Sequence, residues 1–180
     1  MAAHPDHFQL FELAPRFALN PAELDSAYRS VQSRVHPDRF AAGTAAEGRV
    51  AMEWATRANE AYRVLKSPLQ RAAYLCERAG VPIEAESNTT MPPSFLLQQL
   101  EWREALDEAR MANDGHALQS LEAGMLSERD RLHGEITSAL DIHGDPARAA
   151  PLVRQLMFID KFGSEISAAQ DVLRNHHASA

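Results

Sequence analysis

The side chains of His36-Pro37-Asp38 are the ones in this sequence best suited to specific chemistry. An imidazole and a carboxylate this close together can act as a general acid/base pair, or they can form a fixed polar surface for a partner. No nucleophile, glycine-rich phosphate loop or cofactor motif accompanies them, which argues against catalysis. Pro37 restricts the turn, so its neighbours are presented with little conformational freedom. Three basic residues add a face suited to an acidic partner: Arg29, Arg34 and Arg39.

Few other side chains could bind a metal. His4, Asp6 and His7 near the start, and His176-His177 near the end, provide too few ligands at suitable spacing. Cys76 is the single cysteine, so it can form neither an internal disulfide nor a cysteine-rich cluster, and it is predicted to be a buried structural residue. The sequence therefore predicts no metal site and no cofactor.

Composition limits the classes of partner. The chain has 180 residues, 45% of them hydrophobic, and a net charge of −7, which argues against general nucleic-acid binding. It has no apolar run long enough to span a bilayer and no secretory or transit pattern, so a cytoplasmic protein that does not bind membranes is expected. Residues 1–79 contain 10 Lys/Arg and 9 Asp/Glu, whereas residues 80–180 contain 8 and 16. The two parts therefore present different surfaces, which indicates different partners.

The first part reads as helices on either side of the His-Pro-Asp turn. A short helix is expected over 6–13, and a second begins at Asn20-Pro21, where asparagine can cap and proline suits the first helical position. The second helix should end at His36, because Pro37 disfavours helical geometry there. Thr44 and Glu47 form a capping-box pattern that opens a third helix, and Ser67-Pro68 ends it before a helix over 69–79. The third helix is predicted to carry on one side Val50, Trp54, Ala58, Ala61 and Leu65.

The second part follows a Gly- and Pro-containing linker, residues 80–93. Apolar periodicity then predicts three helices, over about 94–112, 116–142 and 146–175, joined by short connections. Short connections favour an up-down-up bundle.

The helix FLLQQLEWREALDEAR has apolar residues on two faces. Phe95, Trp102, Leu106 and Ala109 cluster as a core stripe, at about 100° per residue. Leu96, Leu97 and Leu100 lie on another side, with Glu101, Arg103, Glu104 and Glu108. Periodicity alone leaves two interpretations open: an exposed leucine patch for a partner, or a central helix that is buried over a wide arc.

The segments AYRSVQSRVHPDRF and ANEAYRVLKSPLQRAAY resemble the second and third helices of the J-domain. The resemblance implies that His36, Pro37 and Asp38 form the loop that activates the ATPase of a DnaK-class chaperone. It also implies that Arg29, Arg34 and Arg39 are the electrostatic surround of this loop.

The segments FLLQQLEWREALDE and MFIDKF resemble the C-terminal domain of the HscB-type co-chaperones of iron–sulfur cluster assembly. This resemblance implies that an IscU-type scaffold protein binds Leu96, Leu97, Leu100, Glu101, Arg103, Glu104, Glu108 and Phe158. Gln98 and Ala105 stand where the family has acidic residues, so this surface is expected to be less negative than usual.

Together these features predict an L-shaped, all-α protein with a J-domain over 1–79, a linker over 80–93 and a three-helix scaffold-binding domain over 94–180. The predicted function is that of a co-chaperone, not an enzyme. It would bind the scaffold, deliver it to an HscA-type chaperone, stimulate the ATPase of that chaperone and so promote cluster transfer. Two alternatives stay open: an adaptor for a different client, and a metal-dependent hydrolase that uses His36 and Asp38.

Overall fold

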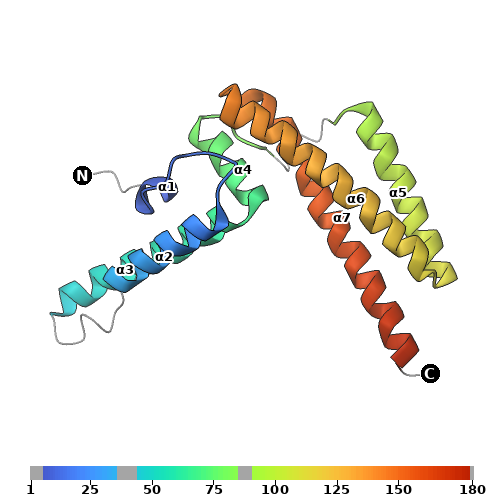
Figure 1. The fold of residues 1–180 in the computed structure, drawn as a ribbon, viewed down its shortest axis with the longest axis horizontal. Coiled ribbons are helices and arrows are strands. Elements are labelled where there is room, and N and C mark those ends of the chain that lie inside the picture. Colours follow the sequence, from blue (N-terminus) through green and yellow to red (C-terminus); the bar gives the residue numbers. More distant parts are fainter. Residues whose placement is uncertain (1–5, 36–43, 85–90, 179–180) are drawn as a thin grey trace. The chain divides into compact units, whose positions relative to one another are not determined.

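The computed structural model describes residues 6–35, 44–84 and 91–178, and all the regular structure in these ranges is helical (Figure 1). The chain divides into two compact units, Met1–Ala79 and Gly80–Ala180. The all-α prediction is therefore confirmed. None of the helices within the described ranges is long and apolar enough to cross a membrane.

The first unit is built around two helices that lie side by side, α2 (Pro21–Val35) and α3 (Ala45–Lys66) (Figure 1). The cap at Asn20 is present, because its Oδ1 accepts a hydrogen bond of 3.0 Å from the backbone N–H of Ala22. α2 is described as far as Val35, and the helix end predicted at His36-Pro37 lies outside the described residues.

The ends of α3 also follow the local sequence. Thr44 N–H donates to Glu47 Oε2 at 2.8 Å, and Glu47 N–H donates to Thr44 Oγ1 at 3.3 Å, so the predicted capping box forms. Ser67 ends α3 and caps α4 (Pro68–Arg78) by accepting from Gln70 N–H. The short α1 (His7–Leu10) precedes α2.

The core of this unit is built around one cluster of buried apolar residues: Phe8, Phe11, Leu24, Val31, Ala58, Ala61 and Leu65. Val50, at the start of the apolar side predicted for α3, is 54% exposed. The buried residue at this end of α3 is Ala51, which lies seven residues, or two turns, before the buried Ala58. Cys76 is fully buried, as predicted.

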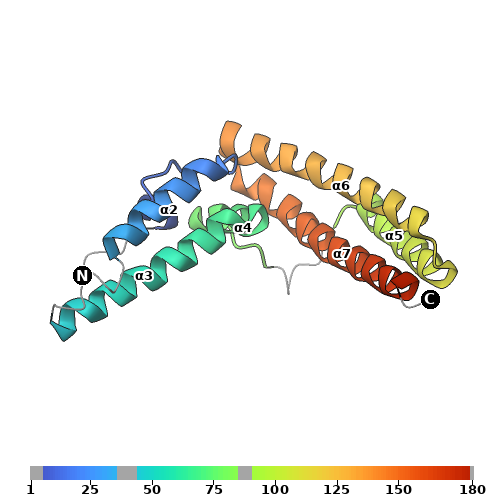
Figure 2. The ribbon, with the colours of Figure 1, turned by 60° about the horizontal axis from the view of Figure 1, so that its bottom comes forward.

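The second unit is a bundle of α5 (Pro93–Ala112), α6 (Gly115–Thr137) and α7 (Pro146–Ala178). α6 and α7 lie side by side along much of their length (Figure 2). Asn113 ends α5 in the left-handed conformation at φ 51°, and Asp114 caps α6 by accepting from the N–H groups of His116 and Ala117. The predicted linker is in part attached to this unit, since Ile83 is buried and its carbonyl accepts from Arg154 at 3.1 Å.

The end of α6 differs from the sequence prediction. Periodicity predicts one α-helix to Ile142, whereas residues Ser138–Ile142 form a π-helical turn. In this turn His143 N–H donates to the carbonyl of Ser138 five residues earlier, at 3.0 Å. Gly144 then adopts φ 61°, which reverses the chain toward α7.

Candidate functional site

α2 carries two of the basic residues that the sequence predicts to contact a partner. Arg29 and Arg34 are both exposed, and neither forms a salt bridge with another residue of the described ranges. The other four predicted residues of this surface, His36, Pro37, Asp38 and Arg39, lie outside the described residues.

Polar side chains tie α2 to α3. Tyr28 OH donates to Asn59 Oδ1 at 2.8 Å, and Gln32 Nε2 donates to the same oxygen at 2.6 Å. Tyr28 also stacks on Tyr62, with ring centroids 4.2 Å apart. This network holds the two helices at a fixed spacing. The sequence did not single out Gln32, although its place one helical turn after Tyr28 puts the two on one face.

A second link lies nearer the start of α2. Asp25 Oδ1 accepts from Lys66 Nζ at 2.6 Å and from Tyr62 OH at 2.9 Å. The hydrogen bond from Lys66, and then that from Tyr62, lowers the pKa of the Asp25 carboxyl, so the carboxylate is ionised at neutral pH. Together with the network above, this link ties α2 to the last two turns of α3.

The three leucines of α5, here called the leucine patch, are exposed. Leu96 is 49%, Leu97 57% and Leu100 54% exposed, whereas Phe95 and Leu106 on the opposite side are 4% and 1% exposed. Of the two interpretations that periodicity leaves open, the structure supports the exposed patch. Three neighbouring leucines on one helix face are an unusual surface for a folded domain and are typical of interaction sites.

Charged side chains surround the leucine patch. Glu101, Glu104 and Glu108 are exposed and form no salt bridge with a described residue. Arg103 is directed elsewhere, since its guanidinium lies over the ring of Phe158, 5.7 Å from the centroid. The rim therefore keeps a net negative charge, even with Gln98 and Ala105 at positions expected to be acidic.

Phe158 connects the patch to the bundle core. Its ring meets Phe95 edge-on, with centroids 5.7 Å apart, and stacks on Phe162 at 5.8 Å. Trp102 stacks on Phe162 at 5.3 Å, so the four rings form one column between α5 and α7. Phe158 is half-buried, which leaves part of its ring accessible beside Arg103. The column holds α5 rigidly against α7, so the leucine patch is preorganised.

The described residues contain no cluster of three or more His, Cys, Asp or Glu side chains that could hold a metal ion. The candidate site consists of two exposed protein surfaces, one on each unit: a basic helix face on α2, and an apolar patch with an acidic rim on α5.

Several known proteins have sequences similar to that of this chain. The family profile described as "HSCB C-terminal oligomerisation domain" matches residues 91–167. The co-chaperone protein HscB homolog of Bordetella pertussis is 52% identical over 168 residues, which cover 93% of this chain and 98% of that protein. The homolog of Burkholderia vietnamiensis is 53% identical over 162 residues, covering 90% of this chain and 92% of that protein.

Two solved structures have the same fold. The chaperone HscB from Vibrio cholerae matches with a TM-score of 0.82 and 30% identity, over 94% of this chain and 99% of that one. Human co-chaperone protein HscB matches with a TM-score of 0.86 over 93% of this chain and 83% of that one, and at 24% identity it supports the fold alone. With half of all residues identical to curated relatives over nearly the full length, this chain belongs to the HscB family of co-chaperones.

Proposed function

We propose that this co-chaperone is an adaptor in iron–sulfur cluster assembly. One surface binds an IscU-type scaffold protein and the other binds an HscA-type chaperone of the DnaK class. The adaptor delivers the scaffold, stimulates the ATPase of the chaperone and so promotes transfer of the cluster. It contributes binding energy and no reacting group, since the ATPase active site belongs to the chaperone.

The observation that carries this proposal is the exposed leucine patch on a rigid helix. Leu96, Leu97 and Leu100 are about half exposed, while the opposite side of α5 is packed. The acidic rim suits a partner with a basic border around an apolar centre. We assign scaffold binding to this patch together with Glu101, Arg103, Glu104, Glu108 and Phe158.

Chaperone binding is assigned to the first unit. Arg29 and Arg34 give α2 a basic face, and the hydrogen bonds between α2 and α3 keep that face rigid. The loop residues His36, Pro37 and Asp38, with Arg39, complete this proposed surface. A positive helix face suits an acidic groove on the ATPase domain and accelerates the encounter with it.

The two surfaces explain how an adaptor without catalytic groups raises a reaction rate. A chaperone equilibrates between conformations, and a ligand shifts that equilibrium by the difference between its affinities for them. If the first unit binds the hydrolysing conformation more tightly, adaptor binding populates it. A scaffold held by the second unit adds to the shift when both proteins contact the chaperone in one complex.

The test is the steady-state ATPase rate of an HscA-type chaperone with the adaptor, with the scaffold and with both. We expect the adaptor to raise the rate and the scaffold to raise it further. His36→Gln should abolish the increase without changing the circular dichroism spectrum or the scaffold affinity.

A matched control is His116→Gln, which makes the same change at an exposed histidine in the second unit. It should leave the stimulation intact. Full stimulation by the His36→Gln variant would refute the assignment of the loop. A wild-type adaptor that stimulates the chaperone without binding the scaffold would identify an adaptor for a different client.

A further inference from the structure

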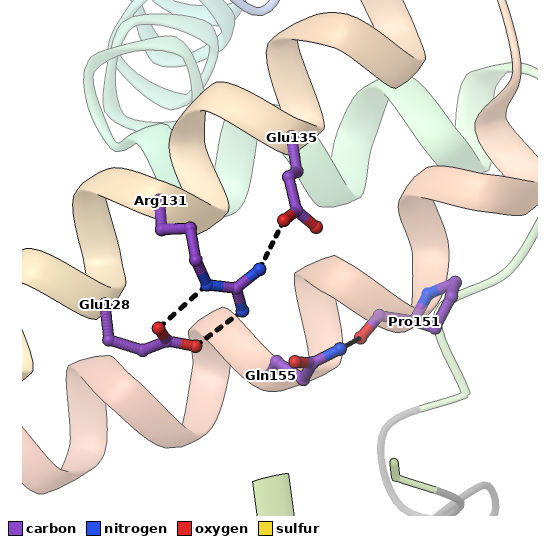
Figure 3. Close-up of polar contacts among 5 residues, drawn as sticks. All are labelled: Glu128, Arg131, Glu135, Pro151 and Gln155. Carbon is purple, nitrogen blue, oxygen red and sulfur yellow. Dashed lines mark hydrogen bonds and ion pairs between the residues drawn. The ribbon is translucent and has the colours of Figure 1, made fainter. Parts of the chain in front are cut away.

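A polar hollow borders the leucine patch and has no role in the function proposed above. It lies where the start of α5 meets α6 and α7 and has a volume of about 420 Å³. Its charged side chains come from α6, and the amide of Gln155 lies opposite them on α7 (Figure 3). The hollow is lined by Pro92, Ser94, Phe95, Gln98, Glu128, Arg131, Glu135, Leu152 and Gln155.

The positive charge in the hollow is neutralised by its neighbours. Arg131 donates through Nε and one terminal nitrogen to both oxygens of Glu128, at 2.8 and 2.6 Å (Figure 3). Its other terminal nitrogen donates to one oxygen of Glu135. The hydrogen bonds that Arg131 donates to Glu128 are the main cause of its raised pKa, so Arg131 stays protonated. The three charges sum to −1, and Glu135 Oε2 has no hydrogen-bond partner among the described residues.

A second acceptor lies on α7. Gln155 is only 5% exposed, and its Nε2 donates to the carbonyl of Pro151 at 3.4 Å. Its Oε1 accepts no hydrogen bond from another described residue. This oxygen is not fully buried, so it is accessible from the hollow and can accept from a ligand that brings an N–H group. The hollow thus offers two open acceptors and a negative charge.

The hollow adjoins the proposed scaffold surface. Ser94 and Gln98 line it, and Leu97 of the leucine patch is the residue directly before Gln98. At about 100° per residue, Leu97 lies about 60° from Ser94 around α5. Arg103, which covers Phe158, lies on the other flank of the patch, about 120° from Leu97. A protein docked on the leucine patch can therefore reach the hollow on one side and Phe158 on the other.

We propose that the hollow is a subsite for one lysine or arginine side chain of the docked scaffold, with Glu135 and Gln155 as its acceptors. This inference rests on the proposed function. Ammonium and guanidinium groups carry donors and no acceptor, which matches two acceptors beside an excess negative charge. An acidic side chain would meet repulsion, because the Arg131 charge is already neutralised by two carboxylates. The subsite would add selectivity for a scaffold with a basic residue at this border.

The test is a set of calorimetric titrations of the scaffold into wild-type protein and three variants. Glu135→Gln removes the charge at nearly constant size and should weaken binding about tenfold, as expected for one charge-assisted hydrogen bond. Gln155→Met removes the acceptor at similar length and should weaken binding about threefold to tenfold. The control Glu122→Gln makes the same charge change on α6, about 20 Å away along the helix, and should leave the affinity unchanged.

A double-mutant cycle identifies the occupant. Exposed lysines and arginines of the scaffold are changed singly to glutamine and titrated against wild-type and Glu135→Gln protein. Substitution of the residue that occupies the hollow should weaken binding to the wild-type protein about tenfold. The same substitution should cause no further loss of affinity for the Glu135→Gln protein. The subsite alone would be overturned by two results together: the Leu97→Ala, Leu100→Ala double variant loses scaffold binding, and the Glu135→Gln variant binds the scaffold as tightly as the wild type. A wild-type protein that does not bind the scaffold would overturn the proposed function itself.

Discussion

The leucine patch allows stability and binding to be separated in one helix. We consider a variant with Leu96, Leu97 and Leu100 all changed to alanine. Each side chain is about half exposed, so each truncation removes little packing, and alanine has the higher helix propensity. The expected loss of unfolding free energy is below about 0.5 kcal/mol per residue. The matched control Leu106→Ala removes a fully buried leucine from the same helix and should cost about 2–5 kcal/mol.

For scaffold binding the order is reversed: the triple variant should have the larger effect and Leu106→Ala the smaller one. Full burial of a leucine side chain contributes about 1.5–3 kcal/mol, so covering the exposed half contributes about 0.7–1.5 kcal/mol for each patch leucine. Three leucines give about 2–4 kcal/mol, which corresponds to roughly a 30- to 1000-fold weaker Kd for the scaffold. Phe158 is left unchanged, because its ring packs in the aromatic column and its removal would mix the two effects.

Two measurements decide the outcome: denaturant unfolding of both variants, and calorimetric titration with the scaffold. The triple variant should keep a near-normal midpoint and lose affinity, whereas Leu106→Ala should lose stability and, while folded, bind nearly as well as the wild type. If the triple variant unfolds as easily as Leu106→Ala, the leucines contribute to packing and the assignment of an exposed docking patch is refuted. Unchanged affinity in a stable triple variant would refute it equally.

Two further predictions follow from groups in the first unit. Burial raises the pKa of the Cys76 thiol to about 11, so the thiolate fraction at pH 8 is about 0.1%. Iodoacetamide should therefore label Cys76 only after the protein unfolds. Rapid labelling of the native protein would contradict this prediction. Burial of Asp6 would raise its pKa, but hydrogen bonds from the Gln9 backbone and from Arg78, 2.8 Å away, lower it below 3.8. The pair of Asp6 and Arg78 therefore stabilises the fold fully at pH values above the pKa that Asp6 has in the unfolded protein. This contribution is lost as the pH falls through the lower pKa that Asp6 has in the folded protein. Asp6→Asn should cost about 0.5 kcal/mol at pH 7 in thermal melts, and a cost that persisted below the folded pKa would argue against the ion pair.

Helix boundaries could be predicted from the sequence because they depend on neighbouring residues. The Asn20 cap, the Thr44–Glu47 capping box and the Ser67-Pro68 break each involve residues within three positions, and each is present as predicted. Local hydrogen bonds and the fixed φ of proline are properties of the sequence itself, and tertiary packing only has to be compatible with them.

Features that depend on several helices at once could not be predicted. Whether Leu97 is covered depends on which side of α5 faces α6 and α7, and helical periodicity is the same in both cases. The exposure of Val50 depends on packing in the same way, since its neighbour Ala51 is the residue that is buried. The polar hollow joins residues 92–98, 128–135 and 152–155, which are far apart in sequence, so no local pattern indicates it.

The apolar content of α5 is best explained by its two tasks. Packing of the bundle requires only the face that carries Phe95, Trp102, Leu106 and Ala109, and polar residues on the opposite face would serve folding equally well. Three exposed leucines instead raise the risk of aggregation and add almost nothing to stability. The aromatic column offsets part of this disadvantage, because a rigid α5 presents the leucines without an ordering cost on binding. A helix that is apolar on two faces therefore indicates one surface for the protein's own core and one for another protein.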